Sequence, residues 1–305
     1  MAVQLATAST IISEIGLSLY PILIKGIPTN LSTQLLSRLG VYSVLVFALC
    51  SKQDRILTWG STGSAFQSVM LGIMNLFHIA ISYLSYTLLP AGSALALFYT
   101  YPFMNILAGV LFYGDTFDIN IIPLMALAFI GVLMIAKYTK DGDENYSEEK
   151  DEKKDEKKDE KKKDGKSVML GVVVALLAAA TETMIFMVGK SSEEPSPFIA
   201  VLRLYPAAFL GILGWIFFKG EPISTESSVW IPMVLFNIIL GFIAYSLRFF
   251  GIIQLPTAFY SILTFVGVAA GYMWGLLYAQ EVPTLGALAG AGLITGSLSF
   301  LRYIK

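Results

Sequence analysis

Long apolar runs separated by short polar breaks dominate this chain. A membrane-spanning helix needs about 20 mostly apolar residues to cross a hydrocarbon core about 30 Å thick. Ten segments of that length fit between breaks that carry charge, glycine or proline. The predicted spans are 5–24, 31–50, 65–87, 92–113, 118–137, 168–189, 197–218, 230–252, 256–278 and 284–303. The pattern therefore predicts an all-α membrane protein with ten transmembrane helices.

One strongly charged stretch divides the ten segments into two sets of five. Residues 140–166 hold ten Lys, twelve Asp or Glu and no aliphatic residue. Such a sequence cannot bury enough apolar surface to offset the entropy lost on ordering. We therefore expect a first five-helix unit over 1–137, a solvated linker or at most a frayed helix over 138–167, and a second five-helix unit over 168–305.

Composition narrows the class of function. Hydrophobic residues make up 55% of the 305 residues, charged residues 14%, and the mean hydropathy is +0.68. Net charge is −1 and no basic face stands outside the linker, so we expect no nucleic-acid partner. A single Cys and a single His argue against an internal disulfide and against a Cys or multi-His metal site. No phosphate-binding loop or catalytic triad is recognisable, so we expect neither an enzyme nor a cofactor.

The first span contains an acid, Glu14, and is not preceded by a basic segment. A cleaved secretory signal has a basic start followed by a short apolar run. The N-terminal segment is therefore interpreted as a retained first helix.

Rare polar residues and prolines recur at a fixed interval in the two sets. Shifts of 165 or 166 residues bring five pairs into register. The pairs are Lys25 with Lys190, Arg38 with Arg203, Lys137 with Arg302, Pro90 with Pro256, and Asp115 with Glu281. Because five is an odd number, a second copy must enter the membrane from the opposite face. The sequence thus predicts two inverted five-helix repeats with a cavity between them near the midplane.

The two halves also share local motifs. Each has a short turn containing proline before its fourth helix, an acidic residue at the end of that helix (LFYGDTF and LLYAQEVP), and a fifth helix rich in Gly and Ala. Together these motifs resemble the repeat of the drug/metabolite transporter superfamily, EamA type. Two departures are Gly-Asp in the first half, where that family usually has Gly-Glu, and the Gln before Glu281. The resemblance implies alternating-access transport of small organic solutes.

Two acids lie near the middle of predicted spans, Glu14 in the first and Glu182 in the sixth. An acid at that depth costs about 2.5–3.5 kcal/mol on insertion scales, so it should face the protein interior, be protonated or be paired. Because hydrocarbon disfavours a charged carboxylate, both are candidate proton carriers. Their setting is similar to the first helix of small multidrug resistance proteins, which implies exchange of protons against a cationic solute. Pairing with an arginine, or capping of a kinked backbone, is the alternative for each.

Arg248 lies deep in the eighth span, within one turn of the position equivalent to His78. An arginine facing a cavity can bind an anionic group through two parallel hydrogen bonds, as a carrier of organic phosphates requires. The alternative is an ion pair with Glu14 or Glu182. His78 is the only side chain with an ordinary pKa near neutrality, and a hydrogen-bonded packing role is the favoured interpretation for it.

Aromatic and small polar side chains lie within the fourth, eighth and ninth spans. Such residues suit a mostly apolar ligand cavity, although Tyr and Trp also form belts at membrane interfaces. The candidate lining residues are Tyr99, Tyr101, Asn105, Tyr245, Tyr260 and Thr264. Arg38 and Arg203 lie six or seven residues inside their spans, so we expect their long side chains to reach the membrane surface.

Three functions are consistent with these features. The first is a secondary transporter of small organic solutes, coupled to protons through Glu14 or Glu182. The second is an antiporter of phosphorylated or nucleotide-linked sugars that uses Arg248. The third is a membrane scaffold without transport activity, whose linker recruits a partner. The expected partners are a small-molecule substrate and membrane lipid.

The orientation in the membrane has two opposing indications. Counting Lys and Arg, the positive-inside rule places the linker in the cytoplasm, whereas the family resemblance implies the reverse. Because the linker's net charge is only −2, we favour cytoplasmic termini. The sequence does not identify the membrane.

Overall fold

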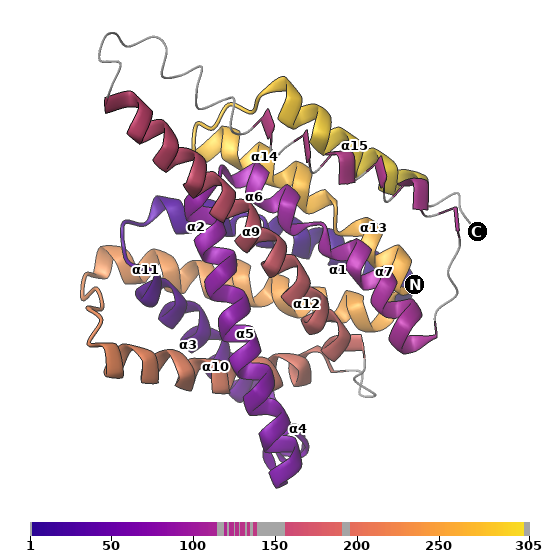
Figure 1. Cartoon of the computed structure of the whole chain (residues 1–305). Coiled ribbons are helices and arrows are strands. Elements are labelled where there is room, and N and C mark those ends of the chain that lie inside the picture. Colours follow the sequence, from indigo (N-terminus) through magenta and orange to yellow (C-terminus); the bar gives the residue numbers. More distant parts are fainter. Residues whose placement is uncertain are drawn as a thin grey trace.

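The computed structural model describes residues 2–114, 119–120, 122–138 apart from five positions (125, 128, 132, 135 and 136), 156–190 and 196–301 (Figure 1). Every regular element in these ranges is a helix. Eight of the spans in these ranges are long and apolar enough to cross a membrane, which indicates a multi-pass membrane protein. They are Val3–Gly26, Leu31–Leu49, Thr62–Leu88, Ala91–Tyr113, Ser167–Lys190, Pro197–Lys219, Ser227–Gln254 and Phe259–Tyr278.

The helices of the first half are α1 (Ala2–Leu17), α2 (Tyr20–Gly26), α3 (Leu31–Leu49), α4 (Lys52–Trp59), α5 (Thr62–Leu88), α6 (Ala91–Phe98) and α7 (Tyr101–Tyr113). Those of the second half are α9 (Glu156–Lys190), α10 (Pro197–Lys219), α11 (Ser227–Phe236), the π-helical stretch η1 (Asn237–Phe242), α12 (Ile243–Gln254), α13 (Thr257–Leu263), α14 (Val266–Tyr278) and α15 (Leu285–Leu301).

Local sequence explains several of these helix ends. The side chain of Asn30 accepts a hydrogen bond from the backbone N–H of Thr33 and so caps α3, and the side chain of Ser51 caps α4 in the same way. Gly220 ends α10 with a φ of 62°, a left-handed conformation that glycine adopts without strain. The polar breaks of the sequence therefore serve as caps.

The predicted spans agree with the eight observed ones to within three residues at each end. The fifth and tenth predicted spans correspond to shorter apolar helices, Ile122–Gly131 and Leu285–Ser297. A helix of 13 residues is about 20 Å long, less than a typical hydrocarbon core. Ten full spans therefore stay a prediction.

The charged linker is helical over a longer stretch than expected. Helix α9 begins at Glu156 and continues to Lys190, so residues 156–166 extend the sixth span rather than forming a solvated coil. Glu and Lys are good helix formers, and a stable apolar helix beyond them supplies the nucleus that an isolated charged segment lacks. The earlier part of the linker, 139–155, lies outside the described residues.

Two spans are interrupted at equivalent places. The fourth span breaks between α6 and α7, at Tyr99 and Thr100, and the ninth breaks between α13 and α14, at Thr264 and Phe265. A shift of 166 residues places 91–98 on 257–264 and 101–113 on 267–279. Broken helices at membrane depth occur where the freed backbone groups are buried in protein or line a cavity.

Most of the helix packing is between the two halves. The main contacts between a helix of the first half and one of the second have counterparts in which the roles of the halves are exchanged. The packing of α1 against α12 is matched by that of α9 against α5, and the packing of α6 against α14 by that of α13 against α7. Likewise, α7 packs on α9 as α14 packs on α1, and α3 packs on α10. Figure 1 shows these helices interleaved in one bundle. The interface between the halves is therefore the core of the protein.

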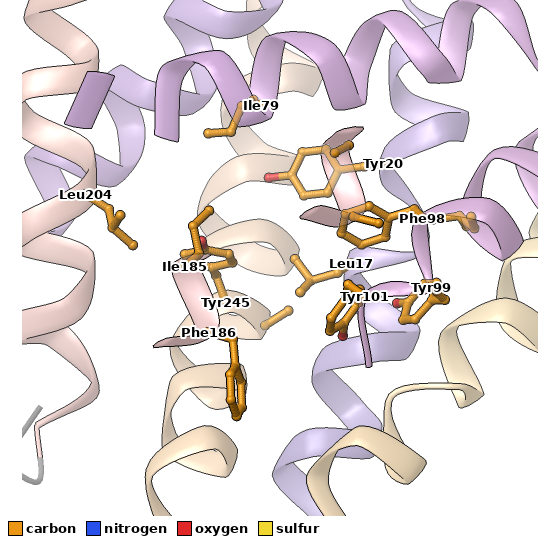
Figure 2. Close-up of a cluster of buried hydrophobic side chains, with 14 of the residues drawn as sticks. Leu17, Tyr20, Ile79, Phe98, Tyr99, Tyr101, Ile185, Phe186, Leu204 and Tyr245 are labelled. Carbon is orange, nitrogen blue, oxygen red and sulfur yellow. The ribbon is translucent and has the colours of Figure 1, made fainter. Parts of the chain in front are cut away.

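The core contains many tyrosines. Figure 2 shows Tyr20, Tyr99, Tyr101 and Tyr245 with Phe98 in the centre of the bundle, and all five side chains are buried. Large apolar side chains of the outer surface, among them Leu111, Phe217 and Phe218, are exposed, as a surface in contact with lipid requires. The polarity of the core thus exceeds that of the periphery.

Close packing of α5 on α10 depends on Gly72. A Cβ atom at this position would lie 2.6 Å from the Cβ of Ala207 and 2.9 Å from the backbone N of Ala208. Gly72→Ala should therefore lower the free energy of unfolding by about 1–3 kcal/mol, measured by thermal or denaturant unfolding in detergent.

Gly214→Ala is the matched control, because Gly214 lies inside α10 and faces open space. Among the described residues, a Cβ atom added there would have no neighbour within 4 Å beyond the backbone of its own helix. The substitution should stabilise the helix by up to about 1 kcal/mol. Equal stability of the two variants would contradict the packing of α5 on α10.

Candidate functional site

The most deeply buried charges form one group, the central charge cluster of Glu14, Glu182 and Arg248. Arg248 Nε lies 3.3 Å from Glu14 Oε1, and an Arg248 Nη atom lies 3.0 Å from Glu182 Oε1. Exposure of the three residues is 0%, 1% and 4% respectively. The pairing that the sequence left as an alternative for each residue is therefore present: one arginine bridges both predicted acids.

Tyrosines add hydrogen bonds to this cluster. Tyr99, at the break between α6 and α7, donates from its hydroxyl to Glu14 Oε2 at 2.5 Å. Arg248 donates to the hydroxyl oxygens of Tyr101 at 2.7 Å and Tyr260 at 3.1 Å. Since the broken fourth span supplies two of these residues, the break places polar atoms on the cluster.

His78 joins the cluster from α5. Its Nε2 lies 3.1 Å from Glu182 Oε2, and its Nδ1 lies 2.8 Å from the hydroxyl oxygen of Thr181. The imidazole is thus in direct contact with a buried carboxylate. Both contacts are consistent with the hydrogen-bonded packing role favoured from the sequence.

A second buried cation, Arg38 on α3, was assigned wrongly from the sequence. Its side chain does not reach the membrane surface but is 7% exposed, inside a ring of tyrosines from five helices. We call this group the tyrosine cage; it consists of Tyr20, Tyr42, Tyr83, Tyr205 and Tyr245. The guanidinium carbon lies 4.3 Å from the ring centre of Tyr20. A desolvated cation–π contact contributes about 2 kcal/mol, which offsets part of the cost of burying the guanidinium. Arg203, by contrast, is partly exposed.

A cavity of about 30 Å³ lies between the tyrosine cage and the central charge cluster. Arg38, Arg248, Glu182, His78, Tyr20 and Tyr245 are among its lining residues. This volume accommodates an atom or molecule about the size of water, and it is far below the several hundred Å³ of an organic ligand pocket. The site as it stands has no room for an organic solute.

Most candidate residues of the sequence converge here, and two do not. Glu14, Glu182, Arg248 and His78 meet directly, with Tyr99, Tyr101 and Tyr260 bonded to them and Tyr245 lining the cavity. Thr264 donates to the carbonyl of Ser261 at the helix break. Asn105 is fully buried in α7 and is not among the residues bonded to the cluster.

The sequence missed the cage residues Tyr20, Tyr42, Tyr83 and Tyr205, and also Asn237. Asn237, in the π-helical stretch, accepts a hydrogen bond from Tyr20 Oη at 2.8 Å and donates to Ser37 Oγ at 3.2 Å. The available signals were the spacing of Arg38 and Tyr42, one helical turn apart, and an amide inside an apolar run.

Polar contacts join the two halves at one face of the bundle. We call this group the loop junction. Lys25 pairs with Glu281, whose second oxygen accepts from the backbone N–H of Ala91 at 2.6 Å. Beside it, Ser32 donates to Glu221, and Asn30 donates to the carbonyl of Pro222 at 2.5 Å. Every one of these bonds connects a residue of the first half to one of the second, so the junction holds this face shut.

Glu221 is more acidic than an ordinary glutamate. Hydrogen bonds from Ser32 and then from Trp215 hold its pKa below the usual value, since both donors favour the ionised carboxylate. The junction contact made by Glu221 is therefore present at neutral pH and is lost as pH falls through that lowered pKa.

Comparisons with known proteins show the fold alone. No family model and no curated protein matches this chain. Nineteen chains of solved structures match. One, titled "Crystal structure of protein", has a TM-score of 0.62 and 13% sequence identity, and the match covers 99% of this chain and 96% of that one. The whole chain thus adopts an architecture seen in a solved protein of similar length.

The central charge cluster generates a stability prediction. Arg248→Ala leaves two carboxylates buried without their counterion, so it should lower the free energy of unfolding by about 3–5 kcal/mol in detergent. Combining Arg248→Met with Glu14→Gln and Glu182→Gln removes all three charges and should recover most of that loss. Equal destabilisation of the single and triple variants would show that the ion pairs are not what the arginine contributes.

The loop junction generates a dynamic prediction. Lys25→Ala should loosen Glu281 and, through it, the start of α6. Amide hydrogen exchange of peptides covering 26–31 and 88–95 should therefore become faster. Lys52→Ala is the control, because Lys52 is an exposed lysine at the start of α4, outside the loop junction. Restoration of slow exchange by Lys25→Glu combined with Glu281→Lys would identify the ion pair as the cause, and unchanged exchange in Lys25→Ala would refute its role.

Proposed function

We propose that this protein is a secondary transporter of small organic solutes that works by alternating access. The observation that carries this proposal is the position of the central charge cluster. Glu14 comes from the first half, whereas Glu182 and Arg248 come from the second. Ionisable groups buried in a membrane bundle are expensive and mark solute or proton pathways. Because the two halves share the cluster, a movement of one half against the other changes the distances between its charged groups.

The proposal includes two inverted five-helix repeats of the EamA type, with ten helices in all. Three features support it: the equivalent breaks in the fourth and ninth spans, the reciprocal packing between halves, and the matched placement of Lys25 and Lys190. Lys25 pairs with Glu281, and Glu281 accepts a hydrogen bond from the backbone N–H of Ala91 at the start of α6. Lys190 donates to the carbonyl of Leu255 at 2.9 Å, at the turn before α13. Interrupted spans in corresponding positions are typical of transporter binding sites.

Alternating access requires a face that is shut and a site that can open. The loop junction supplies ties between the halves at one face. The central cavity of about 30 Å³ is too small for an organic solute. Both features fit an occluded or closed state, from which rocking of one half against the other would enlarge the cavity.

The proposed proton coupling rests on the numbers of positive and negative side chains in the central charge cluster. One arginine faces two carboxylates, and the nearby His78 contacts only Glu182. If movement of the halves separates Arg248 from either acid, that carboxylate is left in a dry environment and binds a proton in place of the lost cation. Glu14 and Glu182 are therefore the proposed proton carriers.

Antiport of phosphorylated or nucleotide-linked sugars through Arg248 has less support, because that guanidinium is already matched by two carboxylates. Anion chemistry is favoured instead at Arg38, which has no such match. The scaffold alternative predicts that function depends on the linker and is insensitive to the cluster.

Flux in liposomes tests the proposal. Reconstituted protein with an entrapped pH-sensitive dye would be exposed to separate panels of organic cations, amino acids, sugars and phosphorylated sugars. At least one panel should drive a proton flux, and Glu14→Gln or Glu182→Gln should abolish it. Glu226→Gln, an exposed loop acid, should leave it unchanged.

The same assay separates the alternatives. Exchange that requires an anion on both sides, without proton flux, would favour the sugar-phosphate antiporter. Folded protein that shows neither proton flux nor exchange with any panel would refute transport of these solute classes.

A further inference from the structure

We propose that Arg38 and its tyrosine cage form a binding site for one small anionic group, either a free halide-sized ion or the carboxylate or phosphate of a solute. The link to a transported solute rests on the proposed function, whereas binding of an anion does not. Four observations carry the inference: an unmatched charge, an unused donor, an adjoining cavity and the sign of the charges around it.

The two buried arginines differ in their counterions. Arg248 has a carboxylate at 3.0 Å and another at 3.3 Å. For Arg38, no carboxylate lies within 4 Å among the residues that the structure describes. A buried cation without an anion is costly unless something else compensates it, so a 7% exposed guanidinium is a place where an anion is expected.

Arg38 also has an unused hydrogen-bond donor. A guanidinium has five N–H donors. One Nη atom donates to Tyr205 Oη at 3.3 Å and the side chain also bonds to Tyr83, but Nε has no partner in the described part of the chain. The faces of the tyrosine rings stabilise a positive charge but cannot accept hydrogen bonds at the edge of the guanidinium plane, where an oxyanion or halide binds.

A cavity is present where the ligand would lie. The space of about 30 Å³ is bordered by Arg38 and reaches Arg248, His78 and Glu182. Its size suits a monatomic anion in the closed form. The carboxylate of a larger solute would need the halves to move apart, which is the motion that the proposed transport cycle requires.

The charges that line the cavity select the sign of the ligand. The four buried charges sum to zero, but both carboxylates lie on Arg248, so the positive charge of the cavity lining is concentrated at Arg38. A cation would be repelled at this end of the cavity, and a neutral solute would leave the local charge of Arg38 unpaired. An anion pairs with it.

Direct binding to the purified full chain in detergent tests the site. The probes are radiolabelled chloride, acetate and inorganic phosphate, each measured by scintillation proximity with unlabelled competitor. At least one should bind saturably to the wild-type protein. Arg38→Gln should weaken that binding at least tenfold, and Arg203→Gln, which alters a partly exposed arginine at the equivalent position of the second half, should not.

Arg38→Lys keeps the charge and guards against a folding defect in Arg38→Gln. It should bind more weakly than wild type, because an ammonium group cannot make the paired contacts of a guanidinium. Binding of chloride alone identifies a free ion as the occupant, and binding of acetate or phosphate identifies the anionic group of a solute. Absence of binding for all three probes, or equal binding in wild type and both Arg38 variants, would overturn the proposal, whatever the liposome assay shows.

Discussion

One arginine, Arg248, holds two buried carboxylates together at the centre of a bundle whose outer surface is apolar. Removing three charges from water is costly, and their mutual attraction compensates only when the geometry is good and the remaining donors are satisfied. Here Arg248 donates to Tyr101 and Tyr260, and Tyr99 donates to Glu14. This requirement explains where the three tyrosines stand, Tyr99 and Tyr101 at the break between α6 and α7 and Tyr260 in α13.

The same requirement explains why packing joins the halves more than it joins helices within a half. Glu14 and Arg248 lie on α1 and α12, which pack together, and Glu182 and His78 lie on α9 and α5, which form the reciprocal pair. Each half thus supplies part of the charge group, Glu14 and His78 from the first and Glu182 and Arg248 from the second. Stability and the central site are consequently coupled, because any separation of the halves also separates the charges.

Spans and their boundaries could be predicted from the sequence, because an apolar run of fixed length is a local property. The participation of Glu14, Glu182, Arg248 and His78 could be predicted too, since an ionisable group in such a run must find a partner. Which of these four residues contact one another could not be predicted from the sequence. Arg38 shows the reason: whether a long side chain turns to the surface or inward depends on helix rotation and on tyrosines from five helices. Linker residues 156–166 are helical rather than frayed for another reason: they are continuous with the helix of the adjoining sixth span.

The two buried arginines differ in how a ligand could reach them. Arg248 is saturated by protein carboxylates, so a ligand can reach it only by displacing Glu14 or Glu182, or after one of them has gained a proton. Arg38 needs no displacement, because it borders the same cavity and its Nε has no hydrogen-bond partner in the described part of the chain. An anion bound at Arg38 adds negative charge beside Glu182 and raises the proton affinity of the carboxylates nearby. Anion binding and proton uptake would then be thermodynamically linked, each strengthening the other by the same factor.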